Sequence, residues 1–371
     1  VIPQEPTSFV RGQLGRMLAL AGAPLGLRFV FVDPDESAPA ARLGRHIVAD
    51  YTDAAALEAL AQTDVVTYEF ESVPTAAVDA LAGKVSVFPP PRALSVARDR
   101  LEEKRLFTQL GIPTPRYLPV ATPQALALAV KETGLPCVLK TRTLGYDGKG
   151  QVVVRDGDEV ARLWSHVEGN LAILESFVPF SRELSVLGVR AQDGATRFYP
   201  LIENAHTSGV LRTSRSPAPD VTPELQARAH DYAAKLLDAL DYVGVLALEM
   251  FQVEGELWAN EIAPRVHNSG HLTIEGARTS QFENHLRAIL GLPLGETELL
   301  GAAGMVNCVG AMPKAADVLS VPDAHLHDYD KTPRPGRKVG HVTLRAADAT
   351  RLEPRMQRLR ELCPWILHGP S

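Results

Sequence analysis

The segment LALEMFQVEGELWANEIAPRVHNSGH, residues 246–271, contains two strand-like runs joined by Glu254 and Gly255. Apolar side chains recur along residues 245–253 and 256–262, and the glycine suits a tight turn between them. The segment therefore predicts a largely buried β-hairpin. Glu249 lies on one arm and Glu261 on the other, so the register of this hairpin decides how close the two carboxylates come.

Two registers are open. A strict two-residue turn pairs Glu249 with Asn260, whereas a turn one residue longer, with Gly255 at positive φ, places Glu249 opposite Glu261 with Cβ atoms about 5 Å apart. Facing carboxylates repel unless a cation bridges them, and Mg²⁺ typically uses one or two carboxylates together with substrate phosphates. We therefore expect Glu249 and Glu261 to bind a metal, with Asn260 assisting. The alternative is a pair of surface glutamates, against which the apolar neighbours argue.

Basic side chains follow the hairpin directly. Residues 263–271 contain Arg265, His267 and His271. A guanidinium group binds a planar carboxylate-like anion through two parallel hydrogen bonds. A lone histidine is usually structural, but His267 stands two residues from Arg265, and we expect both side chains to face an anion.

A second informative segment is KTRTLGYDGKGQ, from Lys140 to Gln151, with three glycines, three basic residues and one aspartate. Apolar runs at 136–139 and 152–154 flank it, which predicts a loop between two antiparallel strands. No helix follows, so the segment is not a P-loop. Glycine amides in such a loop can still line up toward a phosphate, while the alternative is a solvated hairpin tip.

Length and composition exclude several classes of protein. A chain of 371 residues with 45% apolar and 22% charged residues predicts two or three globular domains. The net charge of −6 argues against a nucleic-acid-binding protein. Three widely spaced cysteines predict neither a disulfide framework nor a zinc site and fit a reducing cytoplasm. We expect no signal peptide and no membrane span, because neither a basic start nor a long apolar run is present.

Strand-like and helix-like segments alternate over the first ninety residues, which predicts a parallel, doubly wound sheet. The predicted helices there are 13–21, 54–61 and 73–81, and the predicted strands are 27–32, 64–68 and 85–88. Three prolines at 89–91 then predict a break. A charged helix at 99–110 and an α+β region follow, with strands at 171–175, 183–189 and 196–202 and helices at 124–133, 159–167 and 224–239. The last sixty residues are predicted to be rich in β-strands.

Five motifs together resemble one family. They are GQLGRML (12–18), YEFE (68–71), GYDGKGQ (145–151), NEIAPRVHNSGH (260–271) and RPGRKVGH (334–341). In this order they resemble the ATP-grasp carboxylate–amine ligases, most closely the branch that carboxylates 5-aminoimidazole ribonucleotide in purine biosynthesis, over nearly the whole chain. One departure is Arg11, which stands where the family has a glycine. Residues 7–11 also make a poor strand, so either the first strand is degraded or the start is not the native one.

The resemblance implies a three-part α/β and α+β protein with an ATP-grasp fold. An N-terminal doubly wound (pre-ATP-grasp) domain would span 1–103. The ATP-grasp domain would span 104–292, with a glycine-rich flap at 113–175 and a metal- and nucleotide-binding part at 176–292. A small C-terminal β-rich domain, 293–371, would complete the substrate site.

The implied reaction joins bicarbonate to the exocyclic amine of 5-aminoimidazole ribonucleotide, with ATP and Mg²⁺, through carboxyphosphate. The family also implies a cytoplasmic homodimer whose partners are small-molecule substrates rather than nucleic acid or membrane. It assigns the nucleotide to phosphate-binding side chains, the flap, an interdomain linker and the metal-binding hairpin. These residues are Arg100, Lys140, Gly145, Tyr146, Asp147, Gly148, Lys149, Gly150, Gln151, Glu175, Ser176, Phe177, Val178, Glu183, His206, Asn260 and Glu261.

The metal would lie between Glu249 and Glu261. Groups with a catalytic part would be Asp147, Arg265, His267 and Lys331. The ribonucleotide would contact Gly12, Gln13, Leu14, Glu71, Tyr146, Lys149, Arg265, Lys331, Arg337 and Lys338.

Other functions are weighed against this one. A biotin carboxylase-like or glycinamide ribonucleotide synthetase-like ligase would share the nucleotide and metal residues, but residues 331–341 and YEFE favour the imidazole ribonucleotide. An NAD-dependent oxidoreductase would explain the β/α opening but not Glu249 with Glu261, and GQLGRM lacks GxGxxG spacing. A non-catalytic nucleotide-binding regulator is disfavoured because Asp147, Arg265 and His267 are retained.

Overall fold

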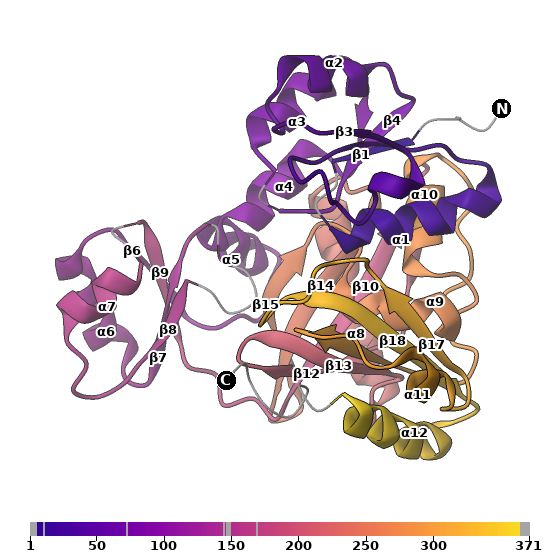
Figure 1. The fold of residues 1–371 in the computed structure, drawn as a ribbon. Helices are drawn as coiled ribbons and strands as arrows, with labels where there is room; N and C mark the ends of the chain where they lie inside the picture. Colours follow the sequence, from indigo (N-terminus) through magenta and orange to yellow (C-terminus); the bar gives the residue numbers. More distant parts are fainter. Residues whose placement is uncertain are drawn as a thin grey trace.

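The computed structural model describes residues 12–71, 73–143, 145, 150–167 and 170–363, together with the backbone of 6–9. Three β-sheets make up its architecture (Figure 1). Arg11 and the flap residues Tyr146, Asp147, Gly148 and Lys149 lie outside the described residues, so the predictions made for them are not tested by the fold.

The N-terminal sheet is parallel and has the strand order β3-β2-β1-β4-β5, as the doubly wound prediction requires. Its strands are β1 (Pro6–Phe9), β2 (Val30–Val32), β3 (Arg45–Ile47), β4 (Val65–Tyr68) and β5 (Ser86–Val87). The accompanying helices are α1 (Gln13–Gly22), α2 (Ala54–Ala61) and α3 (Thr75–Ala82), with short 3₁₀ turns at η1 (Ala23–Leu25) and η2 (Ala41–Leu43). The expectation of a degraded first strand is wrong, because β1 pairs with both β2 and β4 at the centre of the sheet.

The predicted break at residues 89–91 is also wrong in part. Helix α4 (Pro91–Arg98) begins at the last of these prolines. Proline is favourable at the first helical position, where its missing N–H is not needed and its φ is already helical. Helix α5 (Arg100–Gln109) follows at once, and the Asp99 carboxylate caps it by accepting a hydrogen bond from the Leu101 N–H (3.0 Å).

The second sheet carries the glycine-rich loop. It has four antiparallel strands in the order β6-β9-β7-β8, namely β6 (Tyr117–Val120), β9 (Ala172–Ser176), β7 (Cys137–Thr141) and β8 (Gln151–Val154). Helices α6 (Pro123–Thr133) and α7 (Val160–His166) pack on it, and this lobe stands apart from the rest of the molecule (Figure 1). Lys140 pairs with Gln151, which confirms the predicted hairpin around the loop.

The third sheet has nine strands, which come from residues between 182 and 346. Its order is β15-β14-β10-β12-β13-β16-β18-β17, with β11 beside β10. The strands are β10 (Arg182–Arg190), β11 (Thr196–Phe198), β12 (Ile202–Thr207), β13 (Val210–Ser216), β14 (Gly244–Val253), β15 (Glu256–Ala263), β16 (Ala302–Val309), β17 (Ala324–Asp328) and β18 (Lys338–Ala346). Because β16 pairs with β13, the C-terminal strands continue the sheet that carries the hairpin of residues 244–263.

Helices cover this sheet and bury its apolar side chains. They are α8 (Pro223–Ala239), η3 (Asn268–Leu272), α9 (Thr273–Gly276), α10 (Gln281–Ile289), α11 (Ala315–Leu319) and α12 (Ala349–Leu362). Helices α8 and α10 both pack against β10 and β14. Strands β12 and β13 and helix α12 had no counterpart among the predicted elements. Within the described ranges no helix combines the length and the apolarity that a membrane crossing needs.

The hairpin of β14 and β15 combines the two registers considered above. Its turn has two residues, Glu254 and Gly255, both at positive φ, as in a type I′ turn. The longer turn is therefore wrong. Even so, Glu249 lies opposite Glu261, because the register shifts between Glu249 and Met250. Met250 pairs with Ala259, so Asn260 is the extra residue of a β-bulge.

A buried histidine joins the N-terminal sheet to the large sheet. The Val245 N–H donates to His285 Nδ1 (3.1 Å), so the ring proton is on Nε2, which lies 2.9 Å from Thr67 Oγ1. His285 is 1% exposed, and burial lowers its pKa to about 3. Protonation would remove the acceptor that Val245 uses, so the contact requires the neutral ring.

This contact predicts acid sensitivity. The folded-state pKa of His285 lies below the ordinary value of 6.5. At pH values between the two, the unfolded chain binds a proton that the folded chain does not. The free energy of unfolding therefore falls as the pH falls below about 6.5. Between pH 7 and pH 5 the wild-type protein should lose about 2 kcal/mol more unfolding free energy than a His285→Gln variant. Urea unfolding at both pH values measures this difference. His325→Gln, at an exposed site, should behave like wild type.

Candidate active site

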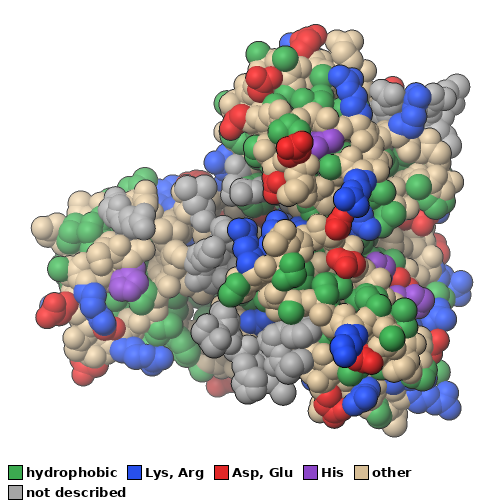
Figure 2. Space-filling view, in the orientation of Figure 1, with side chains coloured by type: hydrophobic (Ala, Val, Ile, Leu, Met, Phe, Trp, Pro, Cys, Tyr) green, Lys and Arg blue, Asp and Glu red, His purple; other side chains and the backbone are tan. Residues whose placement is uncertain are grey.

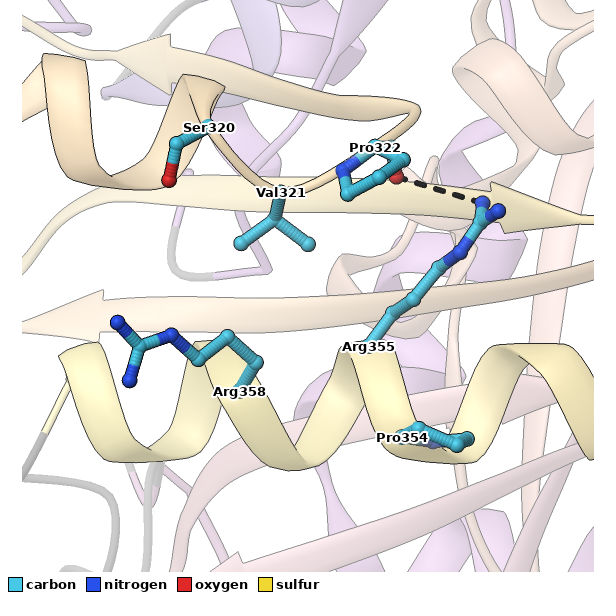
Figure 3. Close-up of a pocket in the computed structure, with 6 residues that line it drawn as sticks. All are labelled: Ser320, Val321, Pro322, Pro354, Arg355 and Arg358. Carbon is cyan, nitrogen blue, oxygen red and sulfur yellow. Dashed lines mark hydrogen bonds between the residues drawn. The ribbon is translucent and has the colours of Figure 1, made fainter.

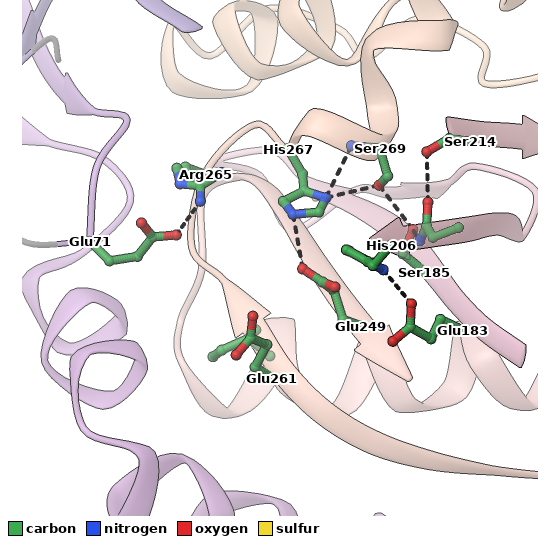
Figure 4. A network of polar contacts seen from close by, with 12 residues as sticks. Glu71, Glu183, Ser185, His206, Ser214, Glu249, Glu261, Arg265, His267 and Ser269 are labelled. Atoms are coloured by element: carbon green, nitrogen blue, oxygen red, sulfur yellow. Dashed lines mark hydrogen bonds and ion pairs between the residues drawn. The ribbon is translucent and has the colours of Figure 1, made fainter. Parts of the chain in front are cut away.

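Two carboxylates face each other on the bulged hairpin (Figure 4). Glu249 on β14 accepts from His267 Nε2 (3.0 Å), and Glu261 on β15 accepts from Arg100 Nη1 (2.8 Å). The side chain of Glu261 is 39% exposed, whereas that of Glu249 is 17% exposed. The pair therefore opens toward solvent from the Glu261 side, where a ligand has access.

The donors at this place suit a hard divalent cation. The Asn260 side-chain oxygen is buried and has no hydrogen-bond partner among the described residues. Two opposed carboxylates and a free amide oxygen match the oxygen ligands that Mg²⁺ prefers, with phosphate oxygens completing its coordination. Within the described ranges, no group of three or more His, Cys, Asp or Glu side chains is arranged to hold a metal ion by itself.

Hydrogen bonds at both ring nitrogens orient His267. The Ser269 N–H donates to its Nδ1 (3.3 Å), so the ring proton lies on Nε2 and points at Glu249. Ser269 Oγ also contacts Nδ1 (2.8 Å) and accepts from Ser185 Oγ (2.9 Å), which in turn accepts from the Asn204 amide (2.9 Å). This buried chain of hydrogen bonds holds the imidazole in one orientation (Figure 4).

The electrostatics of the carboxylates follow from these neighbours. Burial raises the pKa of Glu249, but its interaction with the hydrogen-bonded His267, with His206 and Arg265 nearby, outweighs burial and lowers the pKa to about 2. Glu249 is therefore an anion at neutral pH. That charge state is the one a cation site needs.

Arg265 links the large sheet to the N-terminal domain. Its guanidinium pairs with Glu71, at the end of the YEFE motif, at 2.5 Å. It also donates to the Val266 carbonyl (2.9 Å), while its Nε is buried without a hydrogen-bond partner among the described residues. The sequence prediction of an anion-facing arginine beside His267 is consistent with this arrangement, since a buried N–H of a cation remains available.

Several of the predicted nucleotide residues lie on described strands of the second and third sheets. Lys140 Nζ donates to Glu175 Oε2 (2.8 Å), and the Glu183 carboxylate accepts from His206 Nδ1. Burial lowers the pKa of His206, but Glu183 outweighs it and raises the pKa overall. The linker follows β9, with Ser176 tied to the Arg116 carbonyl through its N–H (2.8 Å), Phe177 exposed and Val178 buried.

The described ends of the flap approach the carboxylate pair. Arg100 donates from Nη2 to the Gly145 carbonyl (3.4 Å) as well as to Glu261. Gly150 has φ +70°, and a Cβ there would lie 2.6 Å from Thr141 Oγ1, so the loop needs a glycine at this point. Figure 2 shows Lys and Arg side chains gathered where the four-stranded lobe meets the rest of the molecule.

Three of the predicted substrate residues, Gly12, Gln13 and Lys331, lie close together. Lys331 Nζ donates to Gln13 Oε1 (2.6 Å), and a Cβ on Gly12 would lie 3.5 Å from the same nitrogen. Leu14, also predicted to contact substrate, buries its side chain in the core against the N-terminal sheet. Only its backbone is left for such a contact.

Lys331 shares its surroundings with further charged groups. Burial and the charge of Arg337 lower its pKa to about 8, Glu69 opposes this shift, and Lys338 adds to it. Arg337 itself donates to the Thr332 carbonyl (3.2 Å). The three basic residues predicted from RPGRKVGH and from position 331 therefore do form one electrostatic group.

Glu69 was not among the predicted site residues. It is 2% exposed, and burial raises its pKa well above the ordinary value, with Arg265 and Lys331 among the opposing charges. It belongs to the same YEFE motif from which Glu71 was chosen. Glu69 and Glu71 both follow strand β4, and the alternation of side chains along the strand does not show which of the two faces the site.

A separate hollow of about 210 Å³ is formed by the C-terminal part of the chain, between residues 320–322 and α12 (Figure 3). Arg355 donates to the Pro322 carbonyl (3.3 Å) and pairs with Asp323 (2.6 Å). Among the described residues, none of those predicted for the site lines this hollow.

Comparison with known proteins defines the class. Residues 105–282 match the ATP-grasp domain, residues 9–98 match the ribonucleotide synthetase preATP-grasp domain, and residues 303–355 match the phosphoribosylaminoimidazole carboxylase C-terminal domain. The chain is thus an ATP-grasp protein of the ribonucleotide synthetase type, and the fold predicted from the resemblance is confirmed.

Relatives narrow the class further. The chain is 54% identical to the N5-carboxyaminoimidazole ribonucleotide synthase of Pseudomonas aeruginosa over 95% of this chain and 97% of that protein. The crystal structure of the Thermus thermophilus synthetase has a TM-score of 0.92 at 52% identity, covering 97% of this chain and 98% of that one. An Aspergillus clavatus synthase, solved with ADP and 5-aminoimidazole ribonucleotide, has a TM-score of 0.91 at 31% identity, covering 98% and 99%. The chain belongs to the N5-carboxyaminoimidazole ribonucleotide synthase family.

The position of Lys331 leads to a test that needs no substrate. After reductive ¹³C-methylation, the NMR signal of this lysine should titrate near pH 8, well below the ordinary lysine value of 10.5. In an Arg337→Ala variant the midpoint should rise, since a neighbouring positive charge has been removed. Lys331→Arg identifies the signal by deleting it. A midpoint above 10 in the wild-type protein would contradict the buried, cation-flanked environment.

Proposed function

We propose that this chain, an ATP-dependent ligase, joins bicarbonate to the exocyclic amine of 5-aminoimidazole ribonucleotide in purine biosynthesis. The products are N5-carboxyaminoimidazole ribonucleotide, ADP and phosphate. The observation that carries the proposal is the register that sets Glu249 opposite Glu261, with Arg265 and His267 on the segment that follows.

The reaction would have two steps. A bicarbonate oxygen attacks the γ-phosphorus of ATP, the bond to ADP breaks, and carboxyphosphate forms. The amine of the ribonucleotide then bonds to the carboxyl carbon as phosphate leaves, and the amine loses a proton. Neither step needs a covalent bond to the protein. The protein's task is to position the reactants, neutralise charge and exclude water.

Arg265 and His267 would bind bicarbonate. The free Nε–H of Arg265 supplies a charged donor, and Glu71 holds the guanidinium from the N-terminal domain. The hydrogen bonds of Ser269 keep the imidazole of His267 turned toward Glu249. The guanidinium and the imidazole therefore start from fixed orientations, which limits the reorganisation needed during reaction.

The nucleotide would lie between the second and third sheets. Lys140 and Arg100 would meet the phosphates, Glu183 the ribose hydroxyls and the backbone of 175–178 the adenine, with His206 and the 145–151 flap as further contacts. Bound Mg²⁺ would supply neutralisation of phosphate charge, held by Glu249 and Glu261 with Asn260 assisting.

The ribonucleotide would lie between the N-terminal domain and the C-terminal strands. Gly12, Gln13, Leu14 and Glu71 border this space on one side. Lys331, Arg337 and Lys338 border the other and would meet the 5′-phosphate. In the flap, Asp147 would orient the amine, with Tyr146 and Lys149 near the ring.

The setting of the enzyme is part of the proposal. Three free cysteines, all buried, fit a reducing cytoplasm. A homodimer and the three-part division at residues 103 and 292 follow from the family resemblance.

A phosphate-release assay tests the function. Release from ATP should require both bicarbonate and 5-aminoimidazole ribonucleotide, and product should appear in equal amount. Glycine with phosphoribosylamine, or biotin with bicarbonate, should not replace them. Turnover with either of these pairs, or none with the expected pair, would overturn the proposal.

Removing one carboxylate tests the metal assignment. Glu261→Gln should lower kcat roughly 100-fold or more, because a neutral amide is a poorer Mg²⁺ ligand and leaves phosphate charge unopposed. The matched control is Glu256→Gln, at an exposed position of the same strand, which should retain wild-type turnover. Equal activity of both variants would refute the assignment. Circular dichroism would show that both are folded.

A further inference from the structure

Strand β15 ends the nine-stranded sheet, so its outer edge has no neighbouring strand. Between residues 259 and 262 this edge is nevertheless hydrogen-bonded to other parts of the chain. The Ala259 N–H donates to the Pro113 carbonyl (2.7 Å), and Thr114 Oγ1 donates to the Ala259 carbonyl (2.9 Å). The residues that follow Ala259 are satisfied by side chains rather than by backbone.

These side chains come from two consecutive positions of α5. Lys104 Nζ donates to the Asn260 carbonyl (2.7 Å), and Glu103 Oε1 accepts from the Ile262 N–H (2.7 Å). Lys104 is 1% exposed and Glu103 is 2% exposed. Lys104 thus satisfies the carbonyl of the residue before Glu261, and Glu103 satisfies the N–H of the residue after it.

The two bonds fall on the bulge. Asn260 is the extra residue of β15, and a bulge leaves such a residue outside the ladder. Side chains alternate between the two faces of a strand, so a one-residue change of register moves a side chain to the other face. Without the bulge Glu249 would pair with Asn260, and Glu261 would no longer lie opposite it.

Burying two ionisable side chains here calls for a reason beyond packing. Buried polar or ionic groups are often no more stabilising than apolar residues of similar size, and their best-attested use is to select one register. Lys104 lies 3.7 Å from the Glu175 carboxylate, which matches its charge. Burial raises the pKa of Glu103 to about 8, so that its carboxyl can accept a hydrogen bond from the strand without carrying a full charge at pH 7. Arg100, one turn earlier on α5, holds the Glu261 carboxylate itself.

We propose that Glu103 and Lys104 are positioning residues that hold the bulged register of β15 and so keep Glu261 opposite Glu249. They touch neither metal nor substrate, and they act through the backbone of Asn260 and Ile262. The inference rests on the proposed function, because Glu249 and Glu261 are the carboxylates that would bind Mg²⁺.

The test measures metal-dependent ADP binding rather than turnover. Calorimetry gives the Kd of ADP in EDTA and in Mg²⁺, and their ratio is the enhancement due to the metal. Glu103→Met and Lys104→Met should lower this enhancement at least about tenfold, as is usual for residues that orient metal ligands. The Kd in EDTA should change less than about threefold, since nucleotide contacts are kept.

Two matched variants separate register from general damage. Glu103→Gln keeps an acceptor for Ile262 and should retain the wild-type enhancement. Thr114→Val removes a bond to the same edge ahead of the bulge and should retain it as well. Wild-type enhancement in both methionine variants, or an equal loss in Thr114→Val, overturns the proposal.

A measurement on the wild-type protein covers the case in which the methionine variants do not fold. Amide hydrogen exchange at Ile262 should be as slow as at the paired residues of β14, because Glu103 accepts this N–H. Exchange at the rate of an open edge amide overturns the proposal. Absence of any Mg²⁺ enhancement in the wild-type protein would instead refute the metal assignment, and the exchange result would still decide the role of Glu103.

Discussion

The site depends on two negative charges held face to face. Glu249 and Glu261 lie directly opposite each other on neighbouring strands, an arrangement that Coulomb repulsion disfavours unless cations surround it. The molecule supplies a hydrogen-bond donor on each side, the His267 imidazole to one carboxylate and the Arg100 guanidinium to the other. The pairing requires a β-bulge, and the bulge in turn requires hydrogen bonds for the residues that it removes from the ladder. Helix α5 provides these bonds, so the chemistry of the hairpin depends on a helix far away in the sequence.

The remaining site residues follow the same rule of paired charges. Lys140 with Glu175, Arg265 with Glu71 and His206 with Glu183 each join an acid to a base where ligand phosphate or bicarbonate would bind. A charge that is buried without a partner is costly, so a site for polyanions in a chain of net charge −6 needs acidic partners while no ligand is bound. Arg265 with Glu71 also joins the N-terminal sheet to the large sheet, so domain contact and the proposed anion binding would use the same guanidinium.

Much of this could be predicted because the signals were local. The doubly wound opening, the flap hairpin and helix α8 followed from periodicity and turn residues. The errors arose where one local rule competed with another. Three consecutive prolines predict a break at Pro91, although proline also suits a helix start. Strands β12 and β13 were missed because their side chains are largely polar, and the Ser208–Gly209 turn between them, with both residues at positive φ, was the available signal. In the sequence pattern, Glu103 and Lys104 are ordinary residues of a charged helix.

By itself the sequence determined the family, because motifs preserve residue type and spacing, and for the same reason it proposed side chains that can bind phosphate or metal. It also brought Glu249 and Glu261 onto the two arms of one hairpin. Only the tertiary structure decided that they face each other. The turn alone allows a register in which they do not, and the choice depends on hydrogen bonds to an edge strand from a helix about 160 residues earlier. No spacing within the hairpin carries that information.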